Sequence, residues 1–99
     1  MENYILEGKK AVPCDVITWA KWFEKADRHV AKDTFGDVFV STVFLGINHS
    51  FGNGPPMLFE TMVFGGPLDQ EQERCSTWDE AKKMHSAMVE RVKANGSNA

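Results

Sequence analysis

The sequence lacks the features that take a protein into a membrane or through one. No apolar run approaches the roughly 18 residues that a transmembrane helix needs. The N-terminus "MENYILEGKK" has no basic region followed by an apolar stretch and a cleavage site. We therefore expect a soluble protein that stays in the cytoplasm where it is made, without a membrane partner.

Clusters of basic residues are also missing. The 99 residues carry a net charge of −3, and no group of lysines and arginines is dense enough to neutralise a row of phosphates. Direct binding of nucleic acid is therefore not expected.

Cysteine is scarce, with only Cys14 and Cys75, and they do not form a CxxC motif. No histidine, cysteine or carboxylate spacing typical of a metal site occurs either. We expect no metal and no cofactor. In a reducing cytosol the two cysteines should be small buried thiols, with a disulfide as the less favoured alternative.

Two segments do have the three- and four-residue apolar spacing of amphipathic helices. The first follows Pro13-Cys14, with Asp15 as its N-cap. The second follows "STWD" at 76–79, which is typical of a capping box with Ser76 as the N-cap, and should end near Asn95-Gly96.

The remaining segments have the alternation and residue types of strands. They are "YILEG" (4–8), "HVAKD" (29–33), "DVFVSTVFLGI" (37–47), "MLFETMVF" (57–64) and the short polar "QERC" (72–75). The predicted order is β-α-β-β-β-β-α. This describes one small α+β domain over residues 1–95, an antiparallel meander sheet with two helices, followed by a frayed tail at 96–99.

Both faces of the central strands are apolar. In "MLFETMVF" one face carries Phe59 and Val63 and the other carries Met62 and Phe64. If both helices pack on one face, the arrangement we favour, the other exposes more apolar surface than a soluble monomer usually tolerates. We then expect a homodimer or another protein partner, with Phe59, Met62 or Phe64 among the contacts. One helix on each face would remove the excess.

Residues 46–56, "GINHSFGNGPP", connect the two best strands and are longer than an ordinary hairpin turn. Glycine and asparagine favour turns, so we interpret the segment first as a connection. Its exposed side chains, together with a tryptophan beside the first helical stripe that we expect to be exposed, are the predicted binding residues: Asn48, His49, Phe51, Asn53 and Trp22.

The alternative is a catalytic loop in which His49 is a general base and Glu60 orients it. No nucleophile or metal-ligand pattern accompanies the histidine, which favours the turn. Glu60 stands in the middle of the most apolar strand. Burying its carboxylate alone would cost several kcal/mol, so it must be paired, face solvent or be protonated. We favour pairing, for example with a Lys or Arg on a neighbouring strand, over catalysis. His85 lies on the apolar stripe of the second helix and should be a hydrogen-bonded core histidine.

The blocks "VSTVFLG" (40–46), "GPP" (54–56), "FETMVFGG" (59–66) and "STWDEA" (76–81) resemble a family of small uncharacterised proteins of tailed bacteriophages and prophages. The likeness spans nearly the whole chain and implies a phage gene product in the bacterial cytoplasm. It implies no activity or catalytic residue.

Two classes of function follow. The favoured one is a non-enzymatic accessory protein that occupies a host or defence protein or sequesters a small signalling molecule. The alternative is a small hydrolase-type enzyme that uses His49 and Glu60 around the glycine-rich loop.

Overall fold

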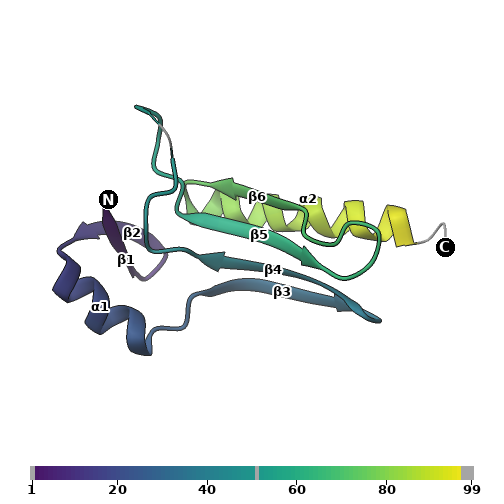
Figure 1. Ribbon diagram of the computed structural model, residues 1–99, viewed down its shortest axis with the longest axis horizontal. Coiled ribbons are helices and arrows are strands. Elements are labelled where there is room, and N and C mark those ends of the chain that lie inside the picture. The colour runs from purple at the N-terminus through teal and green to yellow at the C-terminus, as the bar shows by residue number, and fades with distance from the viewer. Residues whose placement is uncertain (1, 51, 97–99) are drawn as a thin grey trace.

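A computed structural model describes residues 2–50 and 52–96. Within this part of the chain the elements, in order, are β1 (Asn3–Glu7), β2 (Lys10–Cys14), α1 (Val16–Lys25), β3 (His29–Phe35), β4 (Val38–Phe44), β5 (Phe59–Phe64), β6 (Gln72–Cys75) and α2 (Trp78–Gly96) (Figure 1). The body is elongated, with extents of 47 × 30 × 20 Å.

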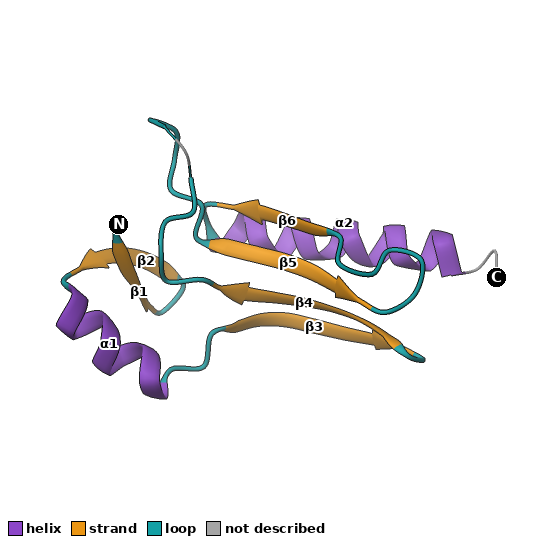
Figure 2. Ribbon diagram, in the orientation of Figure 1, coloured by secondary structure: helices purple, strands orange, loops and turns teal. Residues whose placement is uncertain are grey.

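The strands form two antiparallel sheets (Figure 2). β1 and β2 make a hairpin, and β3, β4, β5 and β6 make a four-stranded meander in sequence order. The predicted α+β class, with two helices and an antiparallel meander, is confirmed.

Strand β2 is an addition to the predicted order. The sequence analysis placed Pro13 and Cys14 directly before the first helix and predicted no strand there, whereas Pro13 lies opposite Tyr4 in the hairpin. A two-stranded hairpin has only edge strands, and an edge tolerates a residue without an N–H group. Asp15 caps α1 as predicted, because its Oδ1 accepts a hydrogen bond from the Thr18 N–H at 2.8 Å.

Helix α2 covers one face of the meander. Six residues of β4 and β5 on this face have exposed fractions of zero; they are Val40, Thr42, Phe44, Phe59, Thr61 and Val63. On the helix side they meet Ala81, Met88, Val89 and Val92. This layer between sheet and helix is the core.

Among residues 2–50 and 52–96, no helix lies over the opposite face of the meander. Figure 1 shows α2 behind the sheet and α1 beyond its end, next to the β1–β2 hairpin, and the main contact of α1 is with β1. The expectation that both helices pack on one face is therefore wrong, since α1 covers neither face. That expectation also implied a sheet face with apolar residues and no helix over it, and the described residues do have such a face.

Helix α1 packs its aromatic side chains across the end of the sheet. Gly46, just after β4, has φ +77°, and a Cβ there would lie 2.8 Å from Trp19 Nε1 and 3.2 Å from Phe23 Cε2. Trp22 is half-buried and meets the Phe44 ring edge-on at 5.7 Å between centroids. The expectation that Trp22 is exposed is wrong, because this ring helps to close the core.

Helix α2 begins one residue later than the sequence indicated. The Thr77 hydroxyl accepts the Glu80 N–H at 3.2 Å, and Glu80 Oε1 accepts the Thr77 N–H at 3.1 Å. The capping box is thus Thr77 with Glu80, and Ser76 precedes it. Gly96, assigned to the tail, is the last residue of α2. Residues 97–99 of the predicted tail lie outside the described residues.

Neither of the helices found in residues 2–50 and 52–96 combines the length and the apolar character that crossing a membrane requires.

Candidate functional site

The connection between β4 and β5 is tied to the N-terminus at its base. The Tyr4 N–H donates to the Gly46 carbonyl at 2.8 Å, and Leu45 N–H donates to the Leu58 carbonyl at 2.7 Å. The Asn48 amide braces the loop from inside, because its Oδ1 accepts the N–H groups of Ser50 and Met57. The loop is therefore a braced projection from one end of the molecule, visible in Figure 1.

The predicted binding residues of this loop have different surroundings. His49 and Asn53 are exposed, as expected. The side chain of Asn48 is occupied by the loop itself and by Glu2, to whose Oε1 it donates at 3.3 Å. Phe51 lies outside the described residues. A binding role for His49 and Asn53 stays a prediction, and the geometry assigns Asn48 a structural role.

Glu60 has the partner that its sequence position required. Its Oε2 accepts a hydrogen bond from Arg74 Nε on the neighbouring strand β6 at 2.9 Å, and its side chain is 16% exposed. In residues 2–50 and 52–96 no hydrogen bond or ion pair joins the His49 ring to Glu60. The pair proposed in the catalytic alternative is therefore not assembled.

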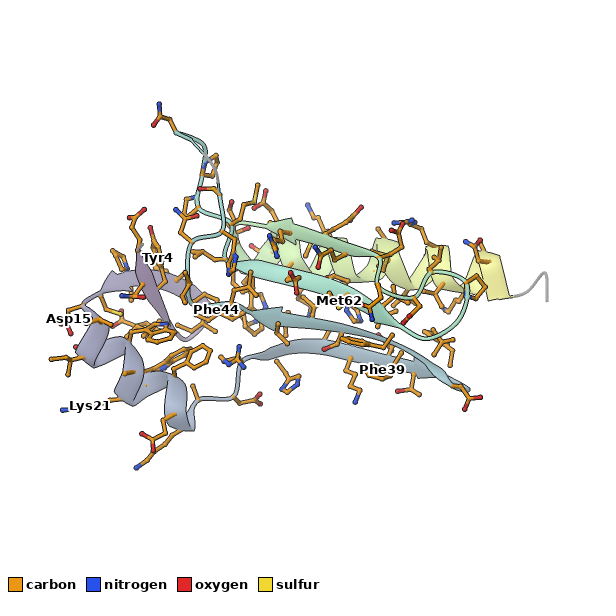
Figure 3. All side chains as sticks on the ribbon, in the orientation of Figure 1. Tyr4, Asp15, Lys21, Phe39, Phe44 and Met62 are labelled. Carbon is orange, nitrogen blue, oxygen red and sulfur yellow. The ribbon has the colours of Figure 1, made fainter. Side chains whose placement is uncertain are left out.

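The uncovered face of the meander carries an aromatic stack. The rings of Phe39 and Phe64 lie parallel within 19°, with centroids 4.7 Å apart, and Lys32 Nζ lies 4.6 Å from the Phe39 centroid. Met62 shares this face in the next row of the register, as its labelled side chain in Figure 3 illustrates. Phe59 belongs to the other face and is wholly buried under α2, so its predicted role as a surface contact is wrong.

A chain of buried polar groups links α2 to the sheet. His85, 4% exposed, has Nδ1 2.7 Å from Thr42 Oγ1 and Nε2 2.7 Å from Asp33 Oδ2. The hydroxyl of Thr42 also contacts that of Thr61. Because a carboxylate only accepts, the ring donates from Nε2 to Asp33, and in the neutral ring Nδ1 accepts from Thr42. His85 is thus a hydrogen-bonded core histidine, as predicted.

The Asp33 carboxylate, the His85 imidazole and the Thr42 hydroxyl are the three types of group found in a nucleophilic triad. The exposed fraction of Thr42, however, is zero. A substrate cannot reach an oxygen with no accessible surface. This row of hydrogen bonds therefore satisfies the buried polar groups of His85, Thr42 and Thr61 and holds α2 in register with the sheet.

A cleft of about 610 Å³ lies between the β1–β2 hairpin, the exit of the 45–58 loop and the start of α2. Tyr4 and Trp78 line it from opposite elements, together with Pro55 and Pro56, and Lys9 Nζ lies 6.0 Å from the centre of the Trp78 ring. A second hollow of about 440 Å³, at the far end of the molecule, has a mainly apolar lining that includes Phe35, Leu68 and Val92.

The residues of the first cleft were missed by sequence reasoning. Lys9 and Lys10 directly follow Gly8, which ends the first predicted strand, and Trp78 lies within the predicted capping box. Only the unpredicted strand β2 brings the two lysines to the start of α2. No local sequence pattern indicates that the lysines lie beside Trp78, because the elements that carry these residues are far apart along the chain.

Both cysteines are free thiols in the structure. Burial, with a smaller contribution from the Glu80 charge, raises the pKa of Cys75 to about 11. A thiol with so high a pKa carries little thiolate at neutral pH and is a poor nucleophile.

No protein-family model matches the chain, and neither a curated protein nor a solved structure matches it.

Proposed function

We propose that the protein is a non-enzymatic binding protein of bacteriophage or prophage origin that acts in the bacterial cytoplasm on a component of the host or of its defences. The supporting observation is the uncovered face of the meander. It places the Phe39–Phe64 stack, Met62 and Val43 on the face of the meander away from α2, where the Glu60–Arg74 ion pair lies beside Val43. Contiguous apolar surface of this kind is typical of an interaction site.

The occupant that fits this face is a second copy of the chain. In the register of β4 and β5, Phe39 lies opposite Phe64 and Ser41 lies opposite Met62. A two-fold axis parallel to the strands, above the gap between β4 and β5, exchanges the two strands between copies. The axis sets Phe39 of each copy over Phe64 of the other, and Met62 of each copy over Ser41 of the other. In the Ser41–Met62 row a large side chain therefore meets a small one.

Polar residues on the edge strands β3 and β6 also fit the proposed dimer. Lys32 on β3 is in the same row as Gln72 on β6, and the axis brings these two together across the interface. Arg74 is neutralised by Glu60 within its own chain. An apolar centre with a polar border is the usual organisation of a protein interface.

With the sheet face covered by a second copy, the end of the molecule with the 45–58 loop remains available. The exposed His49 and Asn53 lie there, next to the cleft lined by Tyr4 and Trp78. We assign contact with the host or defence component to this end. The enzyme alternative has less support, because Arg74 holds the Glu60 carboxylate and the Thr42 hydroxyl is buried.

The dimer is tested by light scattering across the micromolar range. The wild-type protein should have twice the chain mass of 11.1 kDa. Met62→Lys, which introduces a charge into the centre of the face, should give a monomer. The control is Ile17→Lys on α1, which replaces a side chain that is 65% exposed and remote from the sheet face, and it should leave the dimer intact. A wild-type monomer at every concentration would contradict the dimer.

Partner binding is tested by pull-down from infected and uninfected host lysates with mass spectrometry. A specific partner should be captured by the wild-type protein and by Ile17→Lys, and lost with the double variant His49→Ala/Asn53→Ala. Equal capture by all three proteins would contradict the assignment of the loop.

A further inference from the structure

The cleft between the hairpin and the start of α2 has two aromatic walls. Tyr4 comes from β1 and Trp78 from the first residue of α2, and the rigid Pro55-Pro56 segment adds a third side. The volume of about 610 Å³ is within the range of small-molecule sites. Aromatic side chains that line such a cleft suit a planar ring, because stacking gives stabilisation beyond simple burial.

The charge of the cleft is positive, although the chain as a whole has a net charge of −3. Lys9 and Lys10 are among the lining residues, and Asp79 is the carboxylate beside them. In residues 2–50 and 52–96 neither lysine forms an ion pair, and the interaction found for Lys9 is with the Trp78 ring at 6.0 Å. The other acid of the first helical turn, Glu80, is held by the N–H groups of Ser76 and Thr77.

We propose that this cleft binds a small anion that carries a planar ring, of the mononucleotide class. The ring lies against Trp78 and Tyr4, and the phosphate meets the ammonium groups of Lys9 and Lys10. The Lys9 ammonium lies 6.0 Å from the centre of the Trp78 ring, and a phosphate gives it a stronger, charge-assisted partner. This site is separate from the sheet face and does not depend on the dimer.

The uncovered sheet face is a poorer site for such a ligand. Its Phe39 ring is stacked on Phe64, and Lys32 Nζ lies 4.6 Å from the Phe39 centroid. That face is also the one we assign to the second copy of the chain, whereas a base needs an accessible ring face for stacking.

The test is isothermal titration calorimetry of the full chain with AMP, GMP, CMP and UMP, and with adenosine as the ligand without phosphate. At least one mononucleotide should bind with a submillimolar dissociation constant and one site per chain. Lys9→Ala/Lys10→Ala should weaken that binding about tenfold, since an exposed charge pair contributes up to about fivefold for each lysine. Adenosine should bind more weakly than AMP if AMP is the ligand.

The matched control is Lys82→Ala/Lys83→Ala, which removes two adjacent exposed lysines on α2 that do not line the cleft. This variant should bind like the wild type. A single-stranded oligonucleotide serves as a second probe and should bind no more tightly than the mononucleotide, which distinguishes a free nucleotide from a nucleic-acid end. The proposal is overturned if no mononucleotide binds at millimolar concentration, if adenosine binds as tightly as AMP, if the oligonucleotide is preferred, or if both lysine pairs have the same effect.

Discussion

The Nδ1 atom of His85 on α2 lies 2.7 Å from the hydroxyl of Thr42 on β4, and both residues are buried. This contact joins the middle of the long helix to the middle of the sheet. We expect His85→Leu to lower the free energy of unfolding by about 1–3 kcal/mol, because it removes one acceptor from the buried Thr42–Thr61 hydroxyl pair. Urea denaturation followed by circular dichroism measures the change.

The control is the triple variant Thr42→Val/Thr61→Val/His85→Leu. Replacing all the buried partners with apolar groups of similar shape leaves no unsatisfied hydroxyl. It should therefore be more stable than His85→Leu alone. A triple variant that is less stable than the single one would show that packing, rather than hydrogen bonding, makes His85 important.

The helix caps give a second prediction. Thr77→Ala and Asp15→Ala should each lower the unfolding free energy by about 0.5–2 kcal/mol through loss of an N-cap hydrogen bond. Ser76→Ala is the internal comparison, because Ser76 takes part in the cap through its backbone N–H and not its hydroxyl. If Ser76→Ala were as destabilising as Thr77→Ala in thermal unfolding, the capping box would begin at Ser76 after all.

The third prediction concerns the close approach of α1 to the end of β4. Gly46→Ala should lower the unfolding free energy by more than about 1 kcal/mol, because the residue has φ +77° and a Cβ would lie 2.8 Å from the Trp19 ring nitrogen. Gly54→Ala in the same loop is the matched control. Gly54 does not have a positive φ and has open space around its Cβ position, so its replacement should be neutral. Equal midpoints for the two variants in chemical denaturation would refute the predicted packing.

The fourth prediction concerns thiol reactivity. The raised pKa of Cys75, about 11, follows from burial first and the Glu80 charge second. Because the thiolate is the reactive form, the folded Cys14→Ser protein should be alkylated at pH 8 about 100-fold more slowly than the same chain in denaturant. The alkylation rate should rise as the pH approaches 11. Rapid labelling of the folded variant at pH 8, measured by mass spectrometry with iodoacetamide, would show that Cys75 is not buried as described.

The central sheet could be predicted because it depends on patterns between residues close together in the sequence. Alternating apolar residues on β4 and β5 define two faces, and glycines separate the strands at the turns. The need of Glu60 for a partner on a neighbouring strand also follows from its position, since a carboxylate in an apolar strand is costly when alone. Arg74 supplies that partner in the structure.

The prediction failed where two distant segments had to be placed together. Pro13 suits the start of a helix by its own preferences, and only pairing with Tyr4 makes it part of a strand. Trp22 is off the centre of the helical stripe, yet the position of α1 against Phe44 buries half of it. Phe59 and Phe64 are both aromatic residues of one strand, and the side on which α2 packs decides which of them is in the core.

The sequence by itself determined the α+β class, the order of the meander, the cap at Asp15 and the core role of His85, because each depends on residue spacing or on the chemistry of one side chain. The tertiary structure alone decided that α2 covers one face of the sheet while α1 closes its end, and it alone brought Lys9 and Lys10 to Trp78. The physical reason is that packing is non-local. Either face of a sheet with apolar residues on both sides can receive a helix, and the choice depends on how all the elements fit together.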